Sequence, residues 1–252
     1  MSERTIPAEL ARLWRLPIPQ RPGRPPVLDV NQVVAAAIEL ADRHGLAAVT
    51  LEKVAQTLGF TKMALYRHVG SKEQLLELMA DEAIDAPPDI RRAPGQWRAA
   101  LTDCALALRA RYARRGWLLH VPIAGPPQGP NMIGWMEVQL RALRGADLDW
   151  GTKLGLLMPL GGYVRQACLT EQQMLVSRGG RDQADVEHEY GAALARLIDA
   201  ERFPESAKLF AANPFPESVE PGHDMAAADF RFGLDVVLDG IAAALGRSGD
   251  RR

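Results

Sequence analysis

The segment from Thr50 to Gly70, TLEKVAQTLGFTKMALYRHVG, constrains the fold more than any other part of the chain. Thr50 and Thr61 are each suited to cap the start of a helix, and Gly59 and Gly70 are each suited to end one. Two short helices therefore follow each other with only a tight turn between them. They can cross steeply because Ala55 is small where they touch and because Gly59 can take a positive φ.

The residues around this pair complete a compact helical domain. Asp29 can cap a helix that runs to about His44, and the sequence SKEQ at 71–74 is a capping box that opens a fourth helix. Apolar residues can lock the pair to its neighbours: Val54, Leu58, Phe60 and Leu65. A generic helical hairpin inside a core is the alternative. That alternative does not explain why the outward positions of the second helix are neutral or basic, namely Lys62, Met63, Tyr66 and Arg67.

The run from Val33 to Met79 resembles the DNA-binding domain of TetR-type regulators. The sequence GLAAVTLEKVAQTLGFTKMALYRHVGSKEQLLELM carries the resemblance, and its most specific pieces are Leu65-Tyr66-Arg67-His68 and the Gly-Ser-Lys-Glu-Gln-Leu-Leu step. Ala64 departs from the pattern, since many members have threonine there. The resemblance implies a helix-turn-helix domain whose recognition helix, Thr61 to His68, lies in the major groove of DNA.

The resemblance also implies roles for individual side chains. Thr50, Tyr66, His68 and Lys72 would contact phosphates, with Lys72 beside the positive end of the fourth helix. Base reading would fall to Thr61, Lys62 and Met63: lysine can donate to guanine, and Met63 could touch a thymine methyl. Arg67 also belongs to the predicted DNA-binding set.

Residues 1–28 are predicted to be a flexible arm rich in arginine and proline. Leu10, Leu13 and Trp14 could form one short amphipathic turn, but the prolines that follow forbid regular structure. Arg21 and Arg24 could enter a minor groove, or they could belong to a solvated tail. The net charge of the whole chain is −1, yet residues 60–72 carry no acid. Local charge matters more to DNA than the sum over the chain.

The remaining domains are also predicted to be helical, so the expected fold class is all-α. The helix-turn-helix domain should cover residues 29–86 and a larger ligand-binding and dimerisation domain residues 87–252, because Pro87, Pro88 and Pro94-Gly95 mark a boundary. Apolar periodicity predicts five helices after that boundary, at 97–114, 131–144, 152–178, 185–200 and 226–245. The loops at 124–130 and 213–222 are rich in Gly and Pro and long enough to be mobile or to act as a lid.

The C-terminal domain is predicted to hold an effector and to form a homodimer. A cluster of aromatic and Met residues suits a pocket for an apolar or aromatic molecule: Trp97, Trp117, Met132, Trp135, Met136, Met158 and Tyr163. Each of these could equally serve the core. A stripe of small residues on the last helix would let a partner helix approach: Gly233, Val236, Gly240 and Ala243. Alternatively, this stripe faces the core of its own chain.

Other function classes lack support in the sequence. No nucleophile elbow, P-loop, dinucleotide fingerprint or HExxH motif is present, so an enzyme is not expected, and no cofactor is implied. Cys104 and Cys168 are not spaced as a metal site, and a cytoplasmic protein with no membrane partner is expected. The predicted function is a ligand-responsive repressor that is released from a palindromic operator in double-stranded DNA. An activator, or a homologue that has lost DNA binding, is the alternative.

Overall fold

The computed structural model describes residues 6–17, 28–93, 95–215 and 224–249, and helices are the only regular structure in these ranges. They group into two compact units, residues 1–168 with 234–252 and residues 169–233. None of the described helices is long and apolar enough to cross a membrane. The helices are α1 (Ala8–Leu13), α2 (Val30–His44), η1 (Leu46–Ala48), α3 (Leu51–Leu58), α4 (Lys62–Val69), α5 (Lys72–Ile84), α6 (Trp97–Arg114), η2 (Gly116–His120), α7 (Pro130–Ala142), α8 (Trp150–Arg178), α9 (Gln183–Leu197), α10 (Pro204–Ala211) and α11 (Met225–Gly249).

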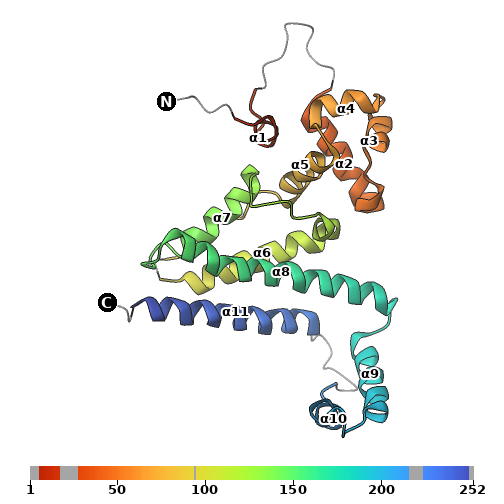
Figure 1. Cartoon of the computed structure of the whole chain (residues 1–252), viewed down its shortest axis with the longest axis vertical. Helices are drawn as coiled ribbons and strands as arrows, with labels where there is room; N and C mark the ends of the chain where they lie inside the picture. The colour runs from red at the N-terminus through yellow and green to blue at the C-terminus, as the bar shows by residue number, and fades with distance from the viewer. Residues whose placement is uncertain (1–5, 18–27, 94, 216–223, 250–252) are drawn as a thin grey trace. The chain divides into compact units, whose positions relative to one another are not determined.

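Helices α2 to α5 form the predicted helix-turn-helix domain (Figure 1). Thr50 and Thr61 cap α3 and α4 with their hydroxyl groups, and Gly59 adopts φ 74°, which a residue with a Cβ rarely adopts. Val54 and Leu65 are fully buried where α3 and α4 meet α2. The capped starts and glycine ends therefore fix the lengths of these helices, as the sequence predicts.

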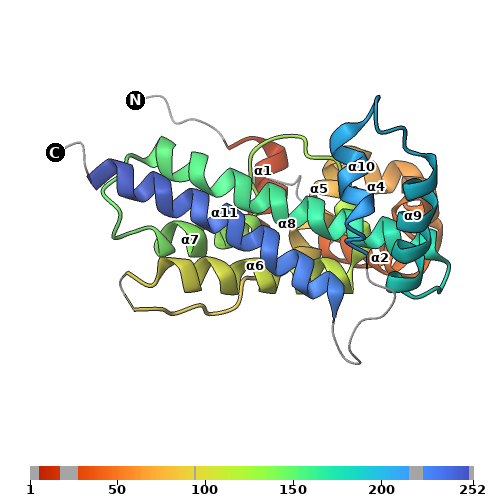
Figure 2. The same cartoon turned by 90° about the horizontal axis from the view of Figure 1, so that it is seen from below.

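The remainder of the first unit is a helical layer made of α6, α7, the part of α8 up to Cys168 and the part of α11 from Leu234. In this unit α8 and α11 lie side by side (Figures 1 and 2). Leu160 on α8 and Leu234 on α11 are buried almost completely. Pro159 lies inside α8 and does not end that helix. The sequence-based boundary at residues 86/87 falls in the connection between α5 and α6, inside this first unit.

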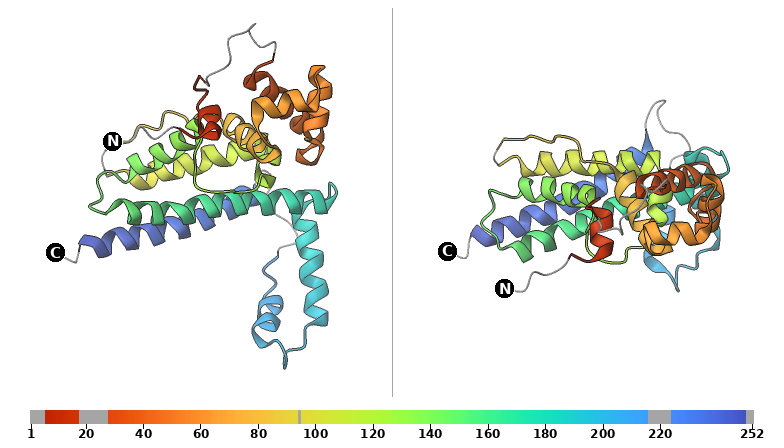
Figure 3. Two further views of the ribbon diagram at one scale, coloured as in Figure 1. Left: turned by 45° about the horizontal axis from the view of Figure 1, so that its top comes forward. Right: turned by 90° about the horizontal axis from the view of Figure 1, so that it is seen from above.

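Helix α1 packs against α5, as the red helix in Figure 3 shows. Leu13 is buried in the same apolar core as α2 and α5, with 5% of its surface exposed. The sequence predicts an amphipathic turn at this place within a flexible arm. The difference is that residues 6–17 are held by the helix-turn-helix domain, because Leu13 finds an apolar partner surface there.

The second unit contains the last turns of α8, then α9 and α10, and the first turns of α11. Tyr190 meets both Phe210 and Phe215 edge to face, with 5.7 and 5.6 Å between ring centroids, and the rings of Phe210 and Phe215 lie tilted to each other. Gly191 lets Phe215 approach, since a Cβ at this glycine would come within 2.8 Å of the Phe215 ring. The sequence analysis did not predict α10, which is only 8 residues long and begins at a proline.

Candidate nucleic-acid interface

Helix α4 presents the predicted recognition side chains to solvent. Met63 is 69% exposed and Tyr66 36% exposed, while Leu65 and Val69 on the opposite face are fully buried. Lys62 and Arg67 are also exposed. The Lys62 ammonium lies 5.8 Å from the centroid of the Tyr66 ring, which orders both side chains on one surface. This helix can therefore offer a basic and apolar edge to a groove of DNA.

The predicted phosphate contacts lie at the ends of the same helices. The Thr50 hydroxyl accepts from the backbone N–H of Lys53 at 3.2 Å, and the Thr61 hydroxyl accepts from that of Ala64 at 3.3 Å. Each threonine keeps its own O–H for donation. Lys72 is exposed at the first position of α5, where unpaired backbone N–H groups favour an anion. Thr50 and Lys72 thus offer donors suited to phosphate oxygens at the starts of α3 and α5, and Thr61, which is predicted to read a base edge, offers one at the start of α4.

His68 lies at the last turn of α4 and is half-buried. Burial lowers the pKa of His68 below its usual 6.5, the positive charge of Arg67 lowers it further, and Asp29 raises it. A neutral imidazole can donate one hydrogen bond to a phosphate. Arg21 and Arg24 of the predicted arm lie outside the described residues.

Asp81 joins the helix-turn-helix domain to α7. Its two carboxylate oxygens accept from the backbone N–H groups of Met132 at 2.9 Å and Asn131 at 3.3 Å, and the Asn131 amide donates to the Asp81 carbonyl at 2.8 Å. Burial raises the pKa of Asp81, against the backbone hydrogen bonds that lower it. The α7 N-cap, Gly129, has no side chain, so a residue of α5 caps α7 in its place. Asp81 therefore links α5 to the start of α7. We call the region where the helix-turn-helix domain meets α7 and η2 the joint.

Two of the predicted pocket tryptophans also lie at this joint. The Trp117 indole donates to the Asp42 carboxylate on α2 at 2.6 Å, and the Trp135 indole donates to the Asp85 carbonyl at the end of α5 at 2.9 Å. Both side chains are buried, with 7% and 4% of their surface exposed. Their positions connect the helix-turn-helix domain to the bundle, so a movement of either side would reach the other.

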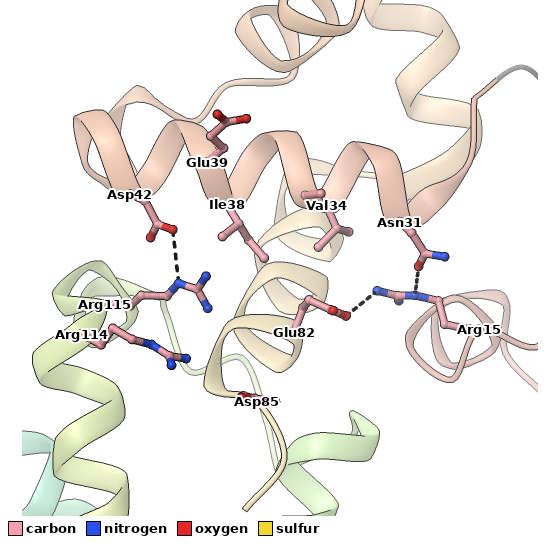
Figure 4. A pocket seen from close by; sticks show the side chains of 11 residues that line it. Arg15, Asn31, Val34, Ile38, Glu39, Asp42, Glu82, Asp85, Arg114 and Arg115 are labelled. Carbon is pink, nitrogen blue, oxygen red and sulfur yellow. Dashed lines mark hydrogen bonds and ion pairs between the residues drawn. The ribbon is translucent and has the colours of Figure 1, made fainter.

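A cleft of about 700 Å³ lies along α2 on the side of the joint. Figure 4 shows Arg115 reaching Asp42 at one end and Arg15 reaching Asn31 and Glu82 at the other. Its floor is apolar and its rim is charged. The lining residues are Arg15, Asn31, Val34, Ala35, Ile38, Glu39, Asp42, Glu82, Asp85, Arg114 and Arg115. None of the predicted effector residues lines this cleft.

The other predicted effector residues are spread over the first unit. Met132 and Met158 are exposed, the latter at 77%, whereas Trp97, Met136 and Tyr163 are half-buried. On α11 the predicted small stripe faces outward: Val236 is 57% exposed, Gly240 and Ala243 are exposed, and Gly233 is half-buried. In the described part of the chain no three His, Cys, Asp or Glu residues are grouped to hold a metal.

Of the residues at the joint, the sequence indicates Trp117 and Trp135 as candidate functional residues but not Asp81, because nothing in the sequence of α5 marks Asp81. One signal was present at residues 129–131, Gly-Pro-Asn, because this start of α7 lacks a strong N-cap side chain and needs an outside acceptor. That signal does not indicate which helix supplies the acceptor.

Comparison with known proteins agrees with this architecture. Residues 33–79 match the family described as bacterial regulatory proteins, tetR family, and residues 91–245 match the tetracyclin repressor-like C-terminal domain. The HTH-type transcriptional repressor DrrR1 of Streptomyces coeruleorubidus is 32% identical over 241 residues, which cover 94% of this chain and 85% of DrrR1. The class A tetracycline repressor of transposon 1721 from Escherichia coli is 30% identical over 219 residues, 85% of this chain and 91% of that repressor.

Solved structures show the same likeness. ActR of Streptomyces coelicolor in complex with actinorhodin superposes with a TM-score of 0.71 at 25% identity, covering 88% of this chain and 99% of ActR. The matched family domains include both the α4 surface and the helical bundle beyond the joint. A chain with a complete helix-turn-helix reader, a matching C-terminal domain and full-length repressor relatives is a regulator and not an enzyme. The protein belongs to the TetR family of transcriptional regulators.

Proposed function

We propose that this regulator is a homodimeric repressor that binds a palindromic operator through α4 and leaves it when a small molecule occupies the C-terminal domain. The observation that carries the proposal is the exposed edge of α4, where Lys62, Met63 and Tyr66 stand outward from a capped and buried framework. Thr61, Lys62 and Met63 read base edges, and Thr50, Tyr66, Arg67, His68 and Lys72 bind the backbone.

The C-terminal domain is the proposed effector site. ActR has been solved with actinorhodin, and other relatives are named tetracycline repressors, so proteins similar to this chain respond to small molecules. The proposed site uses Trp97, Trp117, Met132, Trp135, Met136, Met158 and Tyr163, whose apolar and aromatic surfaces favour a largely apolar or aromatic effector. Trp117 and Trp135 support this placement, since each also hydrogen-bonds to the helix-turn-helix domain.

The proposed dimer uses the outward face of α11. Gly233, Val236, Gly240 and Ala243 form one stripe along the helix, and Phe232 extends it with 75% of its surface exposed. An exposed apolar stripe on a long helix is favourable when a partner helix covers it. A dimer then places two copies of α4 one turn of DNA apart. We expect the protein to be cytoplasmic, because its proposed target is operator DNA.

The Arg21 and Arg24 arm is proposed as a minor-groove contact, with a solvated segment as the alternative. Replacing both arginines by glutamine separates the two. Loss of affinity confined to A·T-rich flanks of the operator supports minor-groove binding. Unchanged affinity on every flank supports the solvated segment.

The test of the proposed function is binding to double-stranded DNA from the region upstream of the gene, followed by fluorescence anisotropy. A panel of aromatic small molecules is then titrated by calorimetry with and without saturating operator. A true inducer binds the DNA-free protein more tightly than the operator complex. Operator then lowers the affinity of the protein for the inducer by the same factor by which the inducer lowers its affinity for operator. Equal affinity in both titrations, for every tight binder, would sink the release mechanism. Activation of transcription by the bound protein would favour the activator alternative.

A further inference from the structure

Helix α1 touches both sides of the joint. On the side of the helix-turn-helix domain, the Arg12 guanidinium donates to the Gln74 amide oxygen at 3.1 Å, in the first turn of α5. Gln74 lies against the turn that ends the recognition helix, since a Cβ at Gly70 would meet its side-chain oxygen at 1.9 Å and the Arg12 guanidinium at 3.1 Å. Arg12 is thus two contacts away from α4.

On the other side, α1 reaches the segment that leads into α7. The Trp14 indole donates to the Gln128 carbonyl at 2.9 Å, one residue before Gly129, the N-cap of α7. Trp14 and Arg12 are separated by one residue on α1. The same short helical segment therefore reaches both the approach to α7 and the first turn of α5, through the side chains of Trp14 and Arg12.

Arg15 fixes the orientation of α1. Its backbone adopts φ 53°, a left-handed conformation that is unfavourable for a residue with a Cβ. Its guanidinium donates to Asn31 on α2 at 2.7 Å, to Glu82 on α5 at 3.3 Å and to the Arg12 carbonyl at 2.9 Å. Three hydrogen bonds to three segments hold this conformation. The end of α1 is consequently anchored to α2 and α5 rather than to one helix alone.

We propose that α1 is a brace that couples the start of α7 to the recognition helix, with Trp14 and Arg12 as positioning residues for operator binding. The inference rests on the proposed function, because it concerns how the C-terminal domain reaches α4. It adds a route that bypasses the body of α5: Gln128 to Trp14, along α1 to Arg12, and through Gln74 to Gly70. A displacement at the start of α7 is then transmitted to the end of α4 through this chain of contacts.

Hydrogen exchange of the full-length protein tests the brace without DNA. Trp14→Phe keeps the ring and removes the N–H that binds Gln128, and Arg12→Met keeps the aliphatic stem and removes the donor to Gln74. Coupling is reciprocal. Trp14→Phe should therefore speed exchange at residues 69–74, far in sequence from the Gln128 carbonyl to which the Trp14 indole donates, and Arg12→Met should speed exchange at 128–134. We expect about three- to tenfold faster exchange, the effect of one lost hydrogen bond.

Matched controls make the same chemical changes away from the brace. Trp150→Phe alters an indole on α8 that is 69% exposed, and Arg144→Met alters an exposed arginine after α7. Neither control should change exchange at 69–74 or 128–134. A purely structural role for α1 would speed exchange only beside each mutated residue. Wild-type exchange at the distant segment in both variants overturns the brace, and distant acceleration in both supports it.

The second arm measures binding to double-stranded DNA from upstream of the gene. Both brace variants should bind about three- to tenfold more weakly with an unchanged salt slope, because neither residue belongs to the phosphate contacts. Wild-type affinity in both variants would overturn the positioning role. If the wild-type protein binds no DNA while exchange remains coupled, the proposed function fails and the mechanical coupling through α1 stands.

Discussion

At the scale of single residues, the DNA contacts proposed for the α4 surface and the start of α5 are of two kinds, which differ in position. Lys62 and Met63 stand in the first turn of α4, where a recognition helix meets base edges, whereas Lys72 stands at the start of the next helix. Base edges carry sequence information and phosphates do not. Replacing either lysine should therefore affect DNA binding in a different way, although both side chains are exposed and carry the same charge.

Lys62→Ala should relax discrimination at one base pair and cost about 1–3 kcal/mol on the preferred sequence. Lys72→Ala should weaken binding about equally on specific and nonspecific DNA and lower the salt slope by about one. Tyr66→Phe should resemble Lys72→Ala in its uniform loss, without the change in salt slope. Anisotropy titrations over a salt series on operator and scrambled DNA measure all three. A uniform loss in Lys62→Ala would contradict the base-reading role.

His68 should make operator binding depend on pH. Its pKa lies below 6.5 in the free protein because of burial and Arg67, and a nearby phosphate would raise that pKa. DNA binding then takes up protons, so affinity should rise as pH falls below 6.5. Folding stability should move the opposite way: the His68 contribution is present above 6.5 and is lost as pH falls, since the unfolded chain binds that proton more tightly.

The measurement is operator affinity between pH 8 and 5.5 in wild type and His68→Gln. Glutamine keeps a hydrogen-bond donor and does not titrate. The variant should lose most of the pH dependence while retaining binding at pH 8. A steep pH dependence of equal size in the variant would assign the proton to another group.

At the scale of elements, local sequence signals predict where the helices begin and end. They do not predict which distant residues a helix contacts. Threonine caps and following glycines set both ends of α3 and α4, and Ser71 sets the start of α5, where the sequence predicts them. The predicted capping box at α5 is only half formed. Ser71 accepts from the Gln74 N–H at 3.1 Å, but the Gln74 side chain accepts from Arg12, a residue 62 positions away. No local pattern contains that partner, because the contact depends on the packing of α1.

The candidate site divides in the same manner. The predicted DNA-binding residues from Thr50 to Lys72 lie within one continuous segment, so the sequence could bring them together, while Arg21 and Arg24 of the same set lie outside the described residues. The effector and joint residues come from segments that meet only in the folded chain. Trp117 illustrates this difficulty: an aromatic residue predicts burial, but its bond to Asp42 of α2 spans 75 positions. The loop at 124–130, predicted to be mobile, is held at Gln128 by Trp14 and at Gly129 by the approach of Asp81.

Gly129 offers a sharp test of the α5–α7 joint. A Cβ there would meet the Asp81 carboxylate oxygen at 2.1 Å, although the backbone at φ −78° suits any residue. Gly129→Ala should therefore displace Asp81 from the start of α7 and lower the free energy of unfolding by about 1–3 kcal/mol. Gly125→Ala is the control, since its Cβ would meet nothing closer than 3.9 Å. Urea denaturation of the two variants measures the difference, and equal midpoints would refute the steric argument.

At the scale of the whole molecule, operator binding requires a second copy, because one short helix gives few contacts. The exposed stripe of α11 is the surface proposed for that copy. A Cβ on Gly240 would meet nothing within 4 Å in the described chain apart from the adjacent backbone of α11 itself. The folded protomer therefore has room for a larger side chain, and any effect of one must come from outside the protomer.

Gly240→Leu should weaken the dimer while leaving the thermal stability of the protomer nearly unchanged. Filling a close helix contact costs about 1–3 kcal/mol, which corresponds to an association weaker by about five- to 150-fold. Light scattering over a concentration series measures it. Gly145→Leu, in a loop with equal free space, is the control. Wild-type association of Gly240→Leu would show that the stripe does not face the partner.

The bonds across the joint have a consequence for how such regulators can be recombined. Several donors of the bundle end on main-chain oxygens: Arg115 on Ala83 at 3.2 Å, Asn131 on Asp81 at 2.8 Å, and Trp135 on Asp85 at 2.9 Å. A main-chain oxygen is present whatever side chain occupies its position. A foreign reader domain grafted before residue 86 would supply most of these acceptors if its last helix ended at the same length. The side chains of Asp42, Asp81, Asp85 (which pairs with Arg111 at 3.4 Å) and Trp14 (which donates to the Gln128 carbonyl) would have to be carried into the chimera by design.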